Sequence, residues 1–116
     1  MGQLWITGFG IVSAIGLGKD QTKESLLASK SGIGKVCYLN TEHTEFPIGE
    51  VKLTNEQMSE MLGIDSGTPV TRTFLIGTLA LQEAIKHAHL NAAMIKKAAL
   101  VSGTTVGGMD KSEKYY

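Results

Sequence analysis

The alternation of apolar and polar positions predicts that the main element of the chain is a long helix over residues 69–89. Pro69 suits the first turn of a helix, where its missing N–H leaves no bond unmade. One face carries Phe74, Leu81 and Ala88, and the other faces are apolar as well. A helix that is apolar nearly all round is expected to be buried on several sides. We therefore expect a partner, or further protein, to pack against it.

Two shorter helices are predicted before the long one. The first spans residues 19–29, and Gly32 suits the left-handed residue that follows a helix end. The residues expected on its packed face are Thr22, Leu26 and Leu27. The second helix follows Thr54, because threonine with Gln57 three residues later is the capping-box pattern. It is expected to end at Gly63.

Continuous apolar runs bounded by glycine predict buried strands over residues 4–7 and 98–102. Residues 46–51 predict an edge strand, since Pro47 cannot donate to a central ladder, and residues 33–38 are expected to be extended. Strands separated by helices favour parallel pairing. The sequence therefore predicts an α/β layered fold with a mixed or parallel sheet and packed helices.

A glycine-rich turn over residues 103–108 follows the last predicted strand. Asp110 and Glu113 then have the spacing of a helix-opening pair, and the sequence stops at Tyr116. A helix of one turn does not stand alone, because nucleation costs more than one turn of hydrogen bonds returns. We therefore expect residues 1–116 to be the amino-terminal part of a larger enzyme.

Composition excludes several classes of function. The 11 basic and 11 acidic residues cancel, which argues against a nucleic-acid or anionic-membrane partner held by charge. No apolar run approaches the roughly 20 residues that span a bilayer, so no membrane segment is expected. Cys37 is the single cysteine, which fits a reducing cytoplasm. We interpret it as a small buried or half-buried side chain and not as a nucleophile.

Cofactor and metal motifs are incomplete. Gly8 and Gly10 resemble half of a dinucleotide fingerprint, but the third glycine position holds Ser13 and no acidic residue follows at the required distance. His87 and His89 are two apart on a helix and cannot share a metal ion, so both are expected to be surface histidines. We expect no cofactor, no metal ion and no assembled catalytic set in this chain.

The turn over residues 103–108 is the most informative motif. Adjacent glycines let the backbone approach another group closely and adopt positive φ. A tight strand-to-helix turn without a ligand explains them equally well. The apolar side chains of Val106 and Met109 do not suit phosphate binding. They are better suited to an apolar ligand or a packed interface.

Five segments, in this order and spacing, resemble the amino-terminal part of an elongating β-ketoacyl-acyl-carrier-protein synthase. They read WITGFGIVSAIG at residues 5–16, LLASKSGI at 26–33, FP at 46–47, TRT at 71–73 and LVSGTTVGG at 100–108. Residues 35–66 match poorly. The resemblance implies a partial thiolase-like layered fold, usually in a homodimer. It also implies acyl-carrier protein and acyl or malonyl thioesters as the parent's partners.

Members of this family condense acyl and malonyl thioesters in fatty acid or polyketide-type biosynthesis. A cysteine carries the acyl chain, and two histidines act on the malonyl thioester; none of the three can be placed within these 116 residues. The resemblance therefore implies that the parent is an acyltransferase and that this chain alone is inactive.

The acyl pocket is the part of the family's site that the resemblance carries over. The residue before the glycine pair of the turn lines the deep end of the acyl channel in the family, and here it is Val106. Thr104, Thr105 and Met109 are weaker candidates for the same wall. The two threonines stand where the family usually has more glycine, which indicates a divergent branch.

Two other functions remain open from the sequence. One alternative is a non-catalytic partner subunit of the chain-length-factor kind, which keeps the fold and lacks the nucleophile. The weaker alternative is a small nucleotide-binding α/β protein, which the partial glycine motif at Gly8 and Gly10 suggests.

Overall fold

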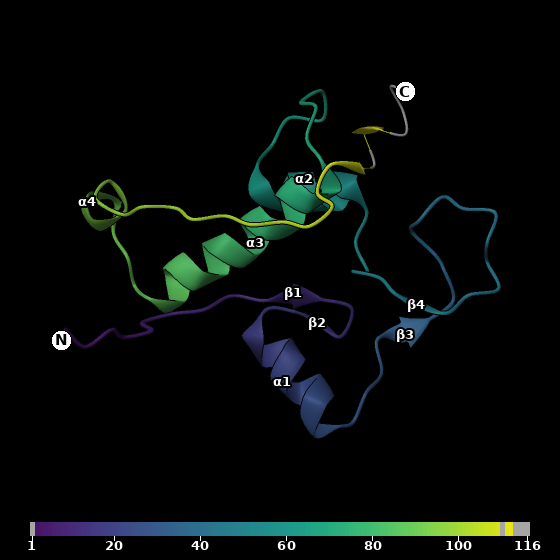
Figure 1. The fold of residues 1–116 in the computed structure, drawn as a ribbon, viewed down its shortest axis with the longest axis horizontal. Coiled ribbons are helices and arrows are strands. Elements are labelled where there is room, and N and C mark those ends of the chain that lie inside the picture. Colours follow the sequence, from purple (N-terminus) through teal and green to yellow (C-terminus); the bar gives the residue numbers. More distant parts are fainter. Residues whose placement is uncertain (1, 110, 113–116) are drawn as a thin grey trace.

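The computed structural model describes residues 2–109 together with 111 and 112. Within this part of the chain it is a small mixed α/β protein with four helices and two small antiparallel sheets (Figure 1). The helices are α1 Lys19–Leu27, α2 Asn55–Leu62, α3 Arg72–His87 and α4 Ala92–Ile95. The strands are β1 Val12–Ser13, β2 Gly16–Leu17, β3 Ile33–Gly34 and β4 Ile48–Gly49.

The predicted parallel or mixed sheet is wrong for the described residues. β1 pairs antiparallel with β2, and β3 pairs antiparallel with β4. β1 and β2 are separated by only two residues, a connection that allows antiparallel pairing alone. The two predicted strands over residues 4–7 and 98–102 have no ladder partner and are exposed. The described residues thus show the α/β class, and a thiolase-like fold is not confirmed.

The three predicted helices are confirmed, with corrections at their ends. Thr54 and Gln57 form the predicted capping box, and Gly63 ends α2 in the left-handed conformation at φ 66°. α3 begins at Arg72 and not at Pro69, because the Thr71 hydroxyl caps it by accepting from the Phe74 N–H at 3.1 Å. The predicted capping pair of Asp110 and Glu113 lies outside the described residues.

α1 packs through a different face from the one that the sequence predicted. Its buried residues are Thr22 and Ser25, and the Ser25 hydroxyl donates to the Ile15 carbonyl at 2.6 Å. Leu26 and Leu27 are 66% and 78% exposed, so their prediction as packed residues is wrong. Gly32 is not left-handed either; Ser29 takes that conformation, at φ 50°.

The hydrophobic core among the described residues is small. Met58 of α2 and Leu75 of α3 are its fully buried members. These two helices pack against each other above the β1–β2 hairpin (Figure 1). Phe74 on α3 is 51% exposed, so the long apolar helix is covered on only part of its circumference.

Residues 8–11 of the N-terminal segment lie directly against the second half of α3 (Figure 1). A Cβ atom on Gly8 would lie 2.6 Å from the Ala88 nitrogen, and one on Gly10 would lie 2.8 Å from the Ala84 nitrogen. Only glycine permits this approach of two backbones. The two glycines that resemble half of a dinucleotide motif therefore allow the N-terminal segment to pack against α3.

Glu83 of α3 joins this segment to α1. Its carboxylate accepts from the Ile11 N–H at 2.9 Å and from the Lys19 N–H at 2.6 Å. Lys19 is the first residue of α1, and its preceding cap, Gly18, offers no side-chain acceptor. Glu83 thus supplies from another helix the acceptor that a helix start needs.

Candidate functional site

The predicted acyl-pocket turn lies at the beginning of α3. A Cβ atom on Gly107 would lie 3.2 Å from the Thr73 side chain and 2.8 Å from the Thr104 hydroxyl, which shows that the turn folds over the first turn of the helix. Gly108 has φ 91°, a conformation that favours glycine. Thr104, Thr105 and Val106 are exposed, and Val106 is 66% so.

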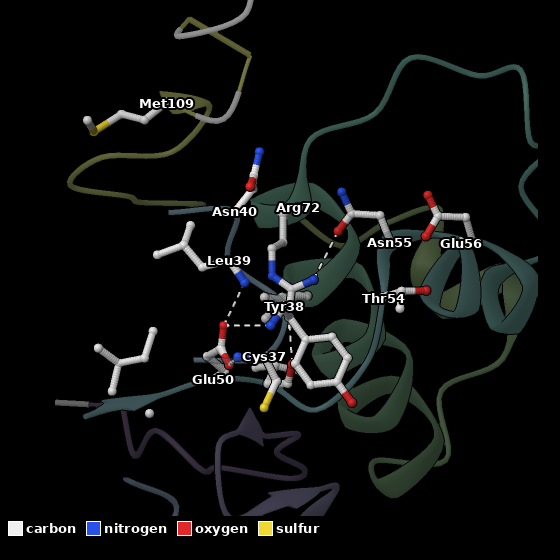
Figure 2. A pocket seen from close by; sticks show the side chains of 14 residues that line it. Cys37, Tyr38, Leu39, Asn40, Glu50, Thr54, Asn55, Glu56, Arg72 and Met109 are labelled. Atoms are coloured by element: carbon white, nitrogen blue, oxygen red, sulfur yellow. Dashed lines mark hydrogen bonds between the residues drawn. The ribbon is translucent and has the colours of Figure 1, made fainter. Parts of the chain in front are cut away.

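A hollow of about 930 Å³ lies next to this turn. It is lined by the loop over residues 37–40, by β4 and the residues after it, by the beginning of α2, and by Arg72 and Ile76 of α3. Of the four predicted acyl-pocket residues, Met109 reaches the hollow, whereas Val106, Thr104 and Thr105 are not among its lining. Figure 2 shows Met109 on the C-terminal segment, apart from the polar residues of the hollow.

Glu50, the residue after β4, organises the polar side of the hollow. Its carboxylate accepts backbone N–H groups of three successive residues: Cys37 at 2.6 Å, Tyr38 at 3.0 Å and Leu39 at 2.7 Å (Figure 2). Desolvation raises the pKa of Glu50, but these N–H donors and the charge of Arg72 outweigh it and hold the pKa below its ordinary value. We call Glu50 with residues 37–39 the Glu50 clasp.

Arg72 fixes the connection between β4 and α2. Its guanidinium donates to the carbonyls of Val51 at 2.8 Å and Leu53 at 2.9 Å, and to the Asn55 side chain at 3.0 Å. Ile76 lies one turn further along α3 and lines the same hollow. The helix therefore presents a polar anchor and an apolar wall within one turn of each other.

Cys37 and the histidines do not form a catalytic set. The Cys37 thiol is exposed, so its prediction as a buried or half-buried side chain is wrong, and it donates to the Lys35 carbonyl at 3.4 Å. His43 pairs with Glu45 in an exposed loop. His87 is half-buried with its ring against Phe9, whereas His89 is exposed, as predicted. Among the described residues no group of His, Cys, Asp or Glu side chains could hold a metal ion.

The sequence did not identify Glu50, Glu83 or Arg72 as site-forming residues. Each acts on backbone atoms more than ten residues away, and no local pattern encodes such a partner. The only available signal was that Arg72 stands between two threonines at the start of the long helix.

The hollow has both polar and apolar lining residues. Two of the polar ones, Glu50 and Arg72, are engaged with backbone atoms of the chain itself. Ile76 and Met109 provide apolar wall on the side of the glycine turn. Ligand pockets of this size combine apolar walls with a few fixed polar groups.

The chain matched no protein-family model, and searches of curated proteins and of solved structures also found no match. Within the described residues, none of the helices combines the length and apolar character that a bilayer crossing requires. Function must therefore be argued from the residues and geometry of this chain.

Proposed function

We propose that this chain is the amino-terminal part of a β-ketoacyl-acyl-carrier-protein synthase. The parent protein joins an acyl thioester to a malonyl thioester with loss of carbon dioxide, on chains held by acyl-carrier protein. The nucleophilic cysteine and the two catalytic histidines belong to protein outside the 116 residues.

The observation that carries the proposal is that three of the five segments with family resemblance meet at one helix. The first segment packs on α3 through Gly8 and Gly10, and the last folds over the start of α3 through Gly107. Residues 71–73 open that same helix. Segments that are far apart in sequence but contact the same helix belong to one packed unit.

Exposed apolar surface supports a larger parent. Leu4 and Ile6 in the N-terminal segment are 100% and 90% exposed, and Val101 in the C-terminal segment is 94% exposed. Extended apolar segments with free backbone groups are ready to join a sheet. We propose that the remaining strands of the parent cover them.

Val106 sets the length of the acyl chain in this proposal. Its turn rests on Thr73 at the start of α3, next to the wall formed by Ile76 and Met109. Protein outside this chain would close the exposed side of the valine and complete the channel. A larger side chain at position 106 would then fill space that the end of the acyl chain needs.

The parent protein tests this assignment. Val106→Phe is expected to shorten the products of condensation, measured by mass spectrometry of the acyl-carrier-protein thioesters. Glu60→Gln, on the exposed side of α2, is the matched control and should leave the product distribution unchanged. Unchanged product length in the Phe variant would remove Val106 from the acyl wall.

The 116-residue chain provides the second test. Incubated with acyl- and malonyl-acyl-carrier protein, it should give no condensation product, because in this proposal the nucleophilic cysteine and the two catalytic histidines lie outside these 116 residues. Turnover by the isolated chain would contradict the proposed location of the catalytic groups. A parent that is inactive and has another residue at the nucleophile position would instead be a partner subunit of the chain-length-factor kind.

A further inference from the structure

His87, the last residue of α3, makes an unusual contact with the N-terminal segment. Its Nδ1 atom lies 3.2 Å from the Phe9 nitrogen and 3.3 Å from the Phe9 carbonyl oxygen. The two rings meet edge to face, with centroids 4.8 Å apart and planes at 83°. One imidazole nitrogen therefore stands within reach of both a backbone donor and a backbone acceptor of the same residue.

The two partners suit opposite protonation states of the imidazole. A neutral ring with its proton on Nε2 can accept from the Phe9 N–H through Nδ1. A protonated ring carries hydrogen on both nitrogens and can only donate, so Nδ1 must turn to the Phe9 carbonyl. Histidine is the side chain that makes this change between about pH 5 and 8.

We propose that His87 is a pH-dependent latch on the N-terminal segment: neutral His87 holds the Phe9 N–H, and protonated His87 releases that N–H and holds the Phe9 carbonyl.

Charged groups of both signs lie near the ring. Asp20 of α1 faces it, and the pKa of Asp20 is lowered first by the hydrogen bond from Lys19 and, with smaller weight, by His87. The C-terminal end of a helix also favours a cation. Lys19 and Lys23 of α1 line the same groove and oppose the positive charge, while Glu83, one turn earlier on α3, favours it. Lys86 precedes His87 in the last turn of α3.

Glu83 confines the change to Phe9. Its carboxylate accepts from the N–H groups of Ile11 and Lys19, and these two hydrogen bonds do not depend on the protonation state of His87. The change of partner at Phe9 therefore leaves β1 and α1 attached, and protonated His87 still contacts the same residue through its carbonyl.

Nuclear magnetic resonance of the 116-residue chain tests the latch. At pH 8 the imidazole nitrogen signals should show Nδ1 without a proton. Between pH 8 and pH 5 the protection of the Phe9 amide against hydrogen exchange, corrected for the intrinsic effect of pH, should fall about threefold to tenfold, the equilibrium worth of one ordinary hydrogen bond. Protection of the Ile11 amide should stay constant.

Two variants separate the latch from a general effect of acid. His87→Gln should remove the pH dependence at Phe9. His89→Asn is the matched control at the same helix end, since asparagine tolerates the positive φ of 52° at that position, and it should leave the pH dependence intact. A proton on Nδ1 at pH 8, constant protection at Phe9, or an equal loss at Ile11 would each overturn the proposal.

Discussion

Glu50 and Glu83 hold segments of the chain that have no long sheet to join. Each carboxylate accepts backbone N–H groups from segments distant in sequence, three for Glu50 and two for Glu83. Hydrogen bonds to a charged acceptor are stronger than those between neutral groups. With strands of only two residues, these contacts replace much of the order that a sheet provides.

Removing the charge of Glu50 should make stability less dependent on pH. Because the folded-state pKa of Glu50 is lowered, its ionised form stabilises the fold above the ordinary glutamate pKa of 4.5, and this contribution is lost as the pH falls through the lowered value. Urea unfolding should therefore show that Glu50→Gln is less stable than the wild type near pH 7, with a difference that shrinks on acidification. A difference that is constant with pH would contradict the clasp.

Gly10 should not tolerate a side chain. Gly10→Ala would place a methyl group against the backbone of α3 at Ala80 and Ala84, and overpacking of this kind costs roughly 1–3 kcal/mol. Gly77→Ala on the same helix is the matched control, because nothing lies within 4 Å of its Cβ position. That change should raise the free energy of unfolding by about 1 kcal/mol. Urea denaturation of the three proteins measures both effects.

At the level of elements, the contact between α2 and α3 is the main source of packing. Leu75→Ala empties a fully buried position and should lower the free energy of unfolding by about 2–5 kcal/mol. Leu81→Ala, at a position 38% exposed on the same helix, should cost clearly less. Equal losses of unfolding free energy in the two variants would contradict this expectation, because they would show that burial of Leu75 adds no stability over a partly exposed leucine.

The helices were predictable because their signals are local. Thr54, Gln57 and Gly63 define α2 within ten residues, and the structure has all three in the predicted roles. α4 was missed because it has only four residues, although Asn91 caps it through a bond from the Met94 N–H at 3.0 Å. A single asparagine before two alanines is too weak a pattern to predict a helix.

The strands were not predictable because pairing is a property of two segments. A continuous apolar run such as residues 98–102 indicates that a segment can enter a sheet, but not which partner it meets. The candidate site has the same limitation. Sequence identified the turn with Val106 and Met109, whereas the hollow beside it depends on Glu50 and Arg72, whose partners lie elsewhere in the chain.

At the scale of the whole molecule, the chain is more open than a compact domain. Its radius of gyration is 16.4 Å, against about 13 Å for a compact domain of about this length. Figure 1 shows the N-terminal segment along α3 and the C-terminal segment returning from α4 toward the start of that helix. Both segments carry large exposed apolar residues, so much of the surface is suited to further contacts.

We therefore expect the isolated chain to self-associate. Static light scattering at increasing concentration should give a mass above the 12.4 kDa of one chain. Val101→Lys places a charge on a side chain that is 94% exposed and should shift the population toward the monomer, since edge lysines oppose strand pairing. A monomer at every concentration would contradict the expectation.

The thiol of Cys37 offers a direct view of the Glu50 clasp. It is exposed, it is the only cysteine in the sequence, and its own backbone N–H is bound to Glu50 at 2.6 Å. A nitroxide or fluorescent tag attached there would need no engineered cysteine and would sit on the loop that the carboxylate restrains. Its rotational freedom would increase when the carboxylate lets go of that loop, so opening of the clasp could be followed in solution.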